Sequence, residues 1–325
     1  MYMRFADAVD NQGFDTGNFA CIGTAAAAGK LFGLSPEQLA HCISMAVVPN
    51  VMLKQARTGQ LSMFYTAPAG QAGRAGVFAA LLAKAGMEGP HLPYEGKAGW
   101  CDHVALKRFS LDTLGGHGVP FKINDALIKT RPATGITMPT ILAAEKVAPI
   151  KNLKEVKQVI VEVYKIATTR EGRYGLNGWI PDSRVTAYYS IPYGVAATLM
   201  DGTVTLRSYN DAHLWNPDLR ALLPKIKVIE NKEFTKAYER LPVEFHTRVT
   251  VEMLNGERLV GESGIDQNDP SAQTWTNTDE QITQKFRGVT EDTLSAKQVN
   301  SILDRLWHLE EMENVAEIPP AFVIV

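Results

Sequence analysis

The sequence predicts an α+β protein, in which a mostly helical part precedes a part that mixes helices and strands. Residues 20–118 are rich in alanine and contain several helix-capping signals. Beyond residue 118, runs of β-branched residues with partial alternation are typical of strands. A length of 325 residues is enough for two domains, each of which buries its own core.

Three helices are expected in the first part. One covers residues 20–31 and ends before Gly33, which takes the position of a C′ glycine. A second begins at the Ser-Pro-Glu-Gln run of residues 35–38 and continues to Pro49. In that run a serine N-cap, a proline at the first helical position and a capping box coincide. The third helix spans residues 66–85.

The third helix is the most informative stretch, because small residues recur along it. They are Ala67, Ala69, Gly70, Ala72, Gly73, Ala75, Gly76, Ala79 and Ala80. Each interior glycine destabilises a helix by roughly 1 kcal/mol relative to alanine. A chain that accepts this cost repeatedly gains either close packing between helices or backbone access to a ligand.

The second part alternates helices and strands. The expected elements are a helix over 138–148, a strand over 156–164, a helix over 191–200, strands over 226–230 and 245–253, and a C-terminal helix over 296–309. Asn255-Gly256, between two strand-like runs, predicts a hairpin with a two-residue turn.

Composition places the domain boundaries. Residues 115–120 are rich in glycine and end in proline, as is typical of a linker. We therefore divide the chain into a helical domain (1–118), an α+β domain (119–264) and a C-terminal segment (265–325). The C-terminal segment is expected to return to the helical domain.

Charge and composition exclude several classes of protein. The net charge of −2 does not favour binding to nucleic acid or to an anionic membrane, so attraction for an acidic substrate must come from a local basic pocket. No uninterrupted apolar run reaches the roughly 18 residues of a membrane span. Cys21, Cys42 and Cys101 and the seven histidines follow no metal-binding spacing. We expect a cytoplasmic protein without a zinc site or an iron–sulfur cluster.

Several segments, taken in order, resemble the MmgE/PrpD family. They cover residues 23–40, 57–62, 66–90, 94–99, 128–133 and 187–202. The resemblance implies a large helical domain, a smaller α+β lid, and an active site in the cleft between them. It also implies cofactor-free and metal-free chemistry on a small polycarboxylate, and a homodimer.

The sequence departs from the family pattern at several points. Family members begin with a substantial helical segment that carries an acidic residue and a histidine of the family site, and no counterpart is found here. Phe14 and Tyr65 stand where the family has histidine and lysine, and Thr134 stands where some members have histidine. A homodimer, or a second chain that supplies the missing helices, would cover the apolar faces that such a shortening exposes.

The resemblance implies a lyase that removes water from, or adds it to, a hydroxy-polycarboxylate such as 2-methylcitrate. This reaction needs a base for the proton beside the carboxylate, an acid for the leaving hydroxyl, and a cation for the developing enediolate. Decarboxylation or epimerisation of a related acid begins at the same carbon and is an alternative. A non-catalytic paralogue or subunit is the other alternative.

Three residues are the catalytic candidates. Lys129 matches a family active-site lysine and is the expected cation, with a solvated lysine of the lid as the alternative. Tyr193 matches a family tyrosine and either acts in the site or packs at the start of a helix. Tyr65 is either a general acid or base beside a cation, or an aromatic residue that packs against neighbouring helices.

Five further residues are candidates for substrate binding: Arg57, Arg131, Asp15, Thr16 and Ser62. Arg57 either binds a carboxylate through two nitrogens or forms a structural ion pair. Arg131 precedes a proline, which favours an extended backbone and a guanidinium that faces the cleft.

The remaining candidates lie in short polar runs. Asp15 and Thr16 either cap a helix or bind ligand, and Ser62 closes the family-like run that starts at Arg57. His117, in the glycine-rich linker, is the histidine that we would test for a functional role.

Overall fold

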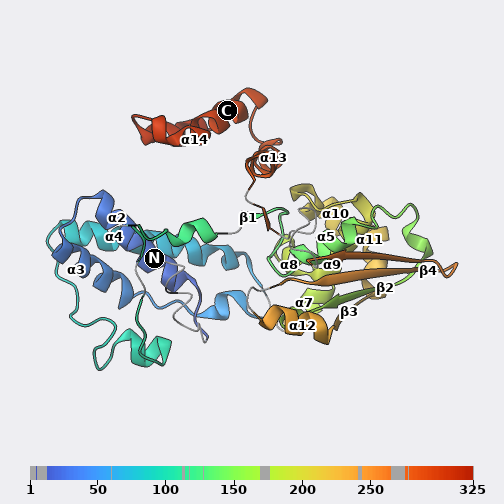
Figure 1. Cartoon of the computed structure of the whole chain (residues 1–325), viewed down its shortest axis with the longest axis horizontal. Coiled ribbons are helices and arrows are strands. Elements are labelled where there is room, and N and C mark those ends of the chain that lie inside the picture. The colour runs from blue at the N-terminus through green and yellow to red at the C-terminus, as the bar shows by residue number, and fades with distance from the viewer. Residues whose placement is uncertain are drawn as a thin grey trace. The chain divides into compact units, whose positions relative to one another are not determined.

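The computed structural model describes residues 5, 13–59, 61–111, 114–116, 118–126, 128–168, 176–240, 244–264, 275–276 and 278–324. His117 lies outside these residues. The chain divides into two compact units, Met1–Ala126 and Leu127–Val325 (Figure 1). The domain limits and the return of the C-terminal segment to the helical domain stay predictions.

The first unit is built on the three predicted helices. They are α2 (Gly17–Leu31), α3 (Pro36–Val47) and α4 (Ala67–Lys84). The capping box of α3 is confirmed, because the Ser35 side chain accepts the Gln38 N–H while the Gln38 side chain accepts the Ser35 N–H. Helix α2 begins earlier than predicted. There the Asp15 carboxylate accepts the Gly17 N–H at 2.8 Å, which satisfies one of the unpaired donors of the first turn.

Short helical turns lie between α3 and α4 and beyond α4. They are η1 (Lys54–Arg57), η2 (Met63–Thr66), the π-helical turn η3 (Cys101–Ala105) and η4 (Lys122–Asp125). One core of this unit consists of alanine and cysteine side chains from α2, α3 and α4. A second core is aromatic, with Phe5 surrounded by Phe19, Tyr94, Trp100 and Phe109.

The second unit contains a four-stranded mixed sheet in the order β3-β2-β4-β5. Its strands are β2 (Val156–Val163), β3 (Ile226–Glu230), β4 (Thr247–Met253) and β5 (Arg258–Ser263). Strand β2 pairs in parallel with β3 and antiparallel with β4, which pairs antiparallel with β5. The predicted α+β class is therefore confirmed.

The hairpin between β4 and β5 is confirmed, but its turn is longer than predicted. Met253 and Glu257 are joined by a hydrogen bond, so that three residues, Leu254 to Gly256, form the connection. Gly256 has φ +89°, and its N–H donates to the Met253 carbonyl. The glycine is the left-handed residue that closes a three-residue turn, rather than the second residue of a two-residue turn.

Helices α5 (Met138–Glu145) and α9 (Ile191–Asp201) pack against this sheet and bury its central strands (Figure 1). Helix α5 ends before its predicted limit of residue 148, because Pro149 disfavours helical backbone in the residue before it. The unit also contains α7 (Leu176–Trp179), α8 (Arg184–Tyr189), α10 (Asp211–Leu214), α11 (Pro217–Leu222), α12 (Lys232–Glu239), η5 (Leu153–Glu155), η6 (Leu206–Tyr209) and η7 (Leu223–Lys225).

The C-terminal segment joins the second unit through a short antiparallel ladder. Strand β1 (Ile128–Lys129) pairs with β6 (Trp275–Thr276), and α13 (Asp279–Thr290) begins soon after β6. The segment continues with α14 (Ala296–Trp307), η8 (Leu309–Glu311), η9 (Val315–Glu317) and α15 (Ile318–Ala321). None of the described helices is both long and apolar enough to cross a bilayer.

Two glycines of α4 differ in how much space surrounds them. A Cβ atom at Gly76 would lie 2.7 Å from the Cys21 carbonyl oxygen and 2.8 Å from the Ala25 nitrogen, both of which belong to the backbone of α2. At Gly73 such an atom would meet nothing within 4 Å. Gly76 is thus required by the contact between α2 and α4, whereas Gly73 is not.

We therefore expect Gly76→Ala to lower the free energy of unfolding by about 1–3 kcal/mol, because two helix backbones must move apart. The matched control, Gly73→Ala, should raise that free energy by about 0.5–1 kcal/mol through helix propensity. Urea unfolding of both variants measures the difference. Equal effects of the two substitutions would contradict the close packing of α2 and α4.

Candidate functional site

Lys129 is held at the end of β1 by neutral groups. Its Nζ donates to the Ala133 carbonyl and to the Tyr188 hydroxyl, each at 3.0 Å, and lies 5.5 Å from the centre of the Tyr188 ring. The Tyr188 hydroxyl in turn donates to the Ala133 carbonyl at 3.0 Å. Among the described residues, no carboxylate lies within ion-pair distance of Lys129. The lysine is thus positioned without losing its charge to a neighbour.

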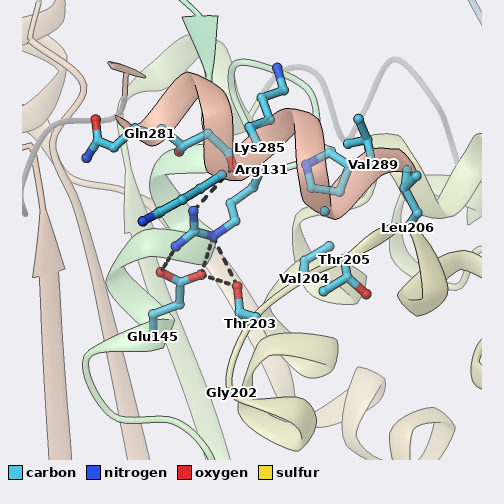
Figure 2. A pocket seen from close by; sticks show the side chains of 14 residues that line it. Arg131, Glu145, Gly202, Thr203, Val204, Thr205, Leu206, Gln281, Lys285 and Val289 are labelled. Carbon is cyan, nitrogen blue, oxygen red and sulfur yellow. Dashed lines mark hydrogen bonds and ion pairs between the residues drawn. The ribbon is translucent and has the colours of Figure 1, made fainter. Parts of the chain in front are cut away.

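Arg131, by contrast, is engaged by a carboxylate. Its Nε and Nη2 donate to the two Glu145 oxygens at 2.7 and 2.9 Å, and Nε also donates to the Thr203 hydroxyl at 3.0 Å (Figure 2). Both charged side chains are largely shielded, with 31% of Arg131 and 17% of Glu145 exposed. This two-pronged pair neutralises the guanidinium that the sequence predicts as a substrate-binding group.

A cavity of about 610 Å³ lies beside this ion pair (Figure 2). One wall is formed by Thr130, Arg131, Pro132 and Glu145, and a second by the segment from Gly202 to Leu206. The third wall is one face of α13: Gln281, Gln284, Lys285, Gly288 and Val289. The volume is in the range of small-molecule sites.

Lys285 is the second cation of this cavity. In Figure 2 its amine end extends away from the Arg131–Glu145 pair. Burial lowers the pKa of the Lys285 ammonium, and the positive charge of Lys129 lowers it further. Lys285 is therefore a cavity-lining lysine whose charged form is disfavoured by its surroundings.

Tyr193 is fully buried and belongs to a hydrogen-bonded chain. Its hydroxyl donates to the Ser208 carbonyl at 2.5 Å and lies 3.0 Å from His213 Nδ1, while His213 Nε2 bonds the Asp201 carboxylate. Burial raises the pKa of the Tyr193 phenol, and the negative charge of Asp201 raises it further. The chain joins the two ends of the segment that contains the Gly202–Leu206 cavity wall. The catalytic role of Tyr193 stays a prediction.

Thr134 contributes no charge to this region. It is buried, and its hydroxyl is paired with that of Thr137 at 2.9 Å. Thr134 therefore supplies a hydrogen-bonded hydroxyl and no ionisable group.

The helical unit brings three of the predicted residues together. Arg57 Nε lies 3.0 Å from the buried Asp15 carboxylate, and the Arg57 guanidinium lies over the Tyr65 ring, 5.7 Å from its centre. Thr16 and Ser62 have exposed side chains, and neither side chain caps the helix that follows it. Asp15 thus serves as a helix-capping residue and an ion-pair partner. The substrate-binding roles of these residues stay predictions.

Three residues of the site were not predicted: Tyr188, Glu145 and Lys285. Tyr188 lies inside the family-like run of residues 187–202, so the sequence indicated this segment although not this residue. Glu145 and Lys285 lie on helices with no distinguishing motif, and only the fold shows their relation to Arg131 and Lys129.

The described cysteines and acidic residues suggest no metal centre. In the part of the chain that the structure describes, no group of three His, Cys, Asp or Glu side chains could hold a metal ion. The thiols of Cys21, Cys42 and Cys101 are buried. Burial raises the pKa of the Cys21 thiol to about 11, with a contribution from Cys42.

Comparison with known proteins identifies the class to which this fold and site belong. Residues 2–111 match the MmgE/PrpD N-terminal domain and residues 132–309 match the MmgE/PrpD C-terminal domain. The chain belongs to the MmgE/PrpD family.

Two curated relatives are the cis-aconitate decarboxylases of Homo sapiens and Mus musculus. Each is 24% identical to this chain, over 303 and 304 residues respectively, and each match covers 90% of the chain. The same matches cover 59% of the human protein and 58% of the mouse protein, so this chain spans less than two thirds of their length.

Two stacked tyrosines allow the buried hydrogen bonds to be tested. We expect Tyr193→Phe to lower the free energy of unfolding by about 1–3 kcal/mol, because the Ser208 carbonyl and His213 lose a buried partner. The control is Tyr209→Phe. The Tyr209 hydroxyl is buried without a hydrogen-bond partner among the described residues, so its loss should be neutral or stabilising. Thermal and urea unfolding measure the stability of both variants. If Tyr209→Phe were destabilised and Tyr193→Phe were not, the assigned hydrogen bonds of Tyr193 would be contradicted.

Proposed function

We propose that this chain is a cofactor-free lyase of the MmgE/PrpD type, which dehydrates or hydrates a small hydroxy-polycarboxylate such as 2-methylcitrate. One observation carries the proposal: within the part of the chain that the structure describes, the partly buried Lys129 ammonium is held by a carbonyl and a hydroxyl and by no carboxylate. Family membership supports the same reaction class.

The chemistry requires such a cation. Loss of a proton from the carbon beside a carboxylate places negative charge on the carboxylate oxygens, which become an enediolate. A fixed ammonium near those oxygens stabilises the charge as it develops. Because the partners of Lys129 among the described residues are neutral, we propose that its charge acts on the substrate.

Tyr188 is the positioning residue in this proposal. Its hydroxyl accepts from Lys129 and donates to the Ala133 carbonyl, so that it fixes the direction in which the ammonium points. Tyr193, buried behind the cavity wall, supports the site from a distance through Ser208 and His213.

Decarboxylation of cis-aconitate is the second candidate, because the two curated relatives are named for it. Loss of carbon dioxide also leaves negative charge beside a remaining carboxylate, and the same cation would stabilise it. The two candidates differ in their products, since only one of them releases carbon dioxide.

We expect the purified protein to convert 2-methylcitrate, citrate or cis-aconitate. Ultraviolet absorbance of a conjugated unsaturated acid detects dehydration, and carbon dioxide release detects decarboxylation. Lys129→Met should lower kcat/KM by about 10²–10³-fold, because a preorganised cation is lost. The control is Lys157→Met, whose side chain is exposed on β2.

Full activity of Lys129→Met would remove Lys129 from the mechanism. If none of the three acids is converted and none raises the melting temperature, the non-catalytic alternative replaces the enzyme.

We also propose the homodimer that the family resemblance implies. An apolar groove of about 730 Å³ on the helical unit, lined by Val48, Phe78, Leu82 and Met87 among others, supports it. The side chain of Phe78 is 60% exposed. Exposed apolar surface of this kind is typical of a protein–protein contact.

Light scattering tests this assembly. Phe78→Asp should shift the protein from dimer to monomer, because a charge would be buried in the contact. Leu31→Asp, at a residue 86% exposed outside the groove lining, should leave the dimer intact. A monomeric wild-type protein would contradict the homodimer.

A further inference from the structure

The cavity wall from Gly202 to Leu206 is a loop that is closed by a histidine (Figure 2). The loop leaves α9 at Gly202, whose left-handed backbone (φ +92°) ends the helix. Asp201 lies directly before the loop, and His213 of α10 lies beyond it. His213 Nε2 is 2.5 Å from the Asp201 carboxylate, and His213 Nδ1 is 3.0 Å from the Tyr193 hydroxyl. The imidazole therefore joins the two ends of the loop.

Hydrogen-bond donors and acceptors fix the protonation of this imidazole. A phenol has one proton, and Tyr193 gives it to the Ser208 carbonyl at 2.5 Å, because a carbonyl can only accept. The Tyr193 oxygen must then accept a proton from His213 Nδ1. The Asp201 carboxylate also only accepts, so His213 Nε2 carries a proton as well. All three bonds form together only when both ring nitrogens are protonated and the imidazole is a cation.

A neutral His213 satisfies only two of these three bonds. With the proton on Nδ1, the bare Nε2 faces the Asp201 carboxylate, and two acceptors repel one another. With the proton on Nε2, the Tyr193 hydroxyl must turn to Nδ1, and the Ser208 carbonyl loses it as a donor. Only 15% of the His213 side chain is exposed, so water replaces a lost partner poorly. Since histidine ordinarily loses a ring proton near pH 6.5, the number of bonds depends on pH.

Charged groups on the elements packed against α10 have partners of their own. Arg184 of α8 lies 3.7 Å from the Asp211 carboxylate of α10. Arg207 of η6 binds Asp292, and Arg220 of α11 donates to a backbone carbonyl at 2.5 Å. The carboxylate before the loop is therefore the charged group bound to the imidazole. The titratable and charged groups on α10 and on these elements are Asp211, Arg184, Tyr188, Tyr189, Arg207, Tyr209, Asp218 and Arg220.

We propose that Asp201 and His213 form a pH-sensitive clasp on the Gly202–Leu206 wall. Mildly acidic solution keeps the imidazole charged, so that all three bonds form and the wall is fixed. Alkaline solution removes one ring proton, so that one bond is lost and the wall loosens. Thr203, whose hydroxyl accepts from Arg131 Nε at 3.0 Å, transmits this change to the ion pair beside the cavity. The clasp does not depend on the reaction proposed above.

Amide hydrogen exchange of the wall measures the clasp, once each rate is divided by the intrinsic rate at the same pH. The probe is the Thr205 N–H, which donates to the Ser208 hydroxyl at 3.1 Å. In the wild-type protein its protection factor should fall about tenfold between about pH 5.5 and pH 8.5, as expected for the loss of one charged hydrogen bond. His213→Ala, which can form neither bond of the imidazole, should have the low protection at both pH values.

A second variant separates the charge of the clasp from its structure. In Asp201→Asn, the amide N–H can donate to a bare Nε2 while Nδ1–H donates to Tyr193, so that a neutral imidazole forms all three bonds. We therefore expect Asp201→Asn to keep its high protection in alkaline solution. The matched control is His308→Gln, at an exposed histidine of the C-terminal segment, which should retain the wild-type pH dependence. Melting temperatures establish that each variant is folded.

Three results would overturn the clasp. The first is a Thr205 protection factor in the wild-type protein that is the same in acidic and alkaline solution. The second is an Asp201→Asn protein that loses protection in alkaline solution as the wild type does, because the carboxylate would then not be the source of the pH dependence. The third is loss of the pH dependence in His308→Gln, which would assign it to another histidine.

Discussion

The two-pronged pair of Arg131 with Glu145 is the interaction on which the described site depends. It joins the segment after β1 to helix α5, and the Thr203 hydroxyl extends it to the loop after α9. A partly buried ion pair of this kind is favourable only when both partners are well hydrogen-bonded, and here they are. Because the pair is internally neutral, it shapes the cavity without supplying net charge to a ligand.

Arg131 and Lys129 lie two residues apart but have different partners. A guanidinium matches the geometry of a carboxylate, so that Glu145 binds it firmly. An ammonium is a point charge with three donors, and a carbonyl and a phenol orient it while its charge persists. Within the described residues, Arg131 thus has a structural ion pair, whereas Lys129 has only neutral hydrogen-bond partners, as the proposed function requires.

Sequence patterns predicted the regular elements well where the signals were local. The capping box at Ser35 and the strand from Val156 are found in the structure, and α2 differs from prediction only at its start. The turn before β5 was wrong by one residue, because Asn-Gly is compatible with both two-residue and three-residue turns and the strand register decides between them. Helix α5 was predicted too long. Its end depends on Pro149, which follows the apolar run and disfavours helical backbone in the residue before it.

The sequence alone determined the α+β class and the family, because capping signals, periodicity and ordered motifs are properties of neighbouring residues. Only the tertiary structure decided which charges are neutralised. Arg131 meets a glutamate 14 residues away and a threonine 72 residues away, and Lys129 meets a tyrosine 59 residues away. Contacts at such separations leave no local pattern, since they arise from the way that helices, strands and loops pack and not from the residues beside each group. For the same reason Lys285, which has no motif of its own, is seen to line a cavity only in the folded structure.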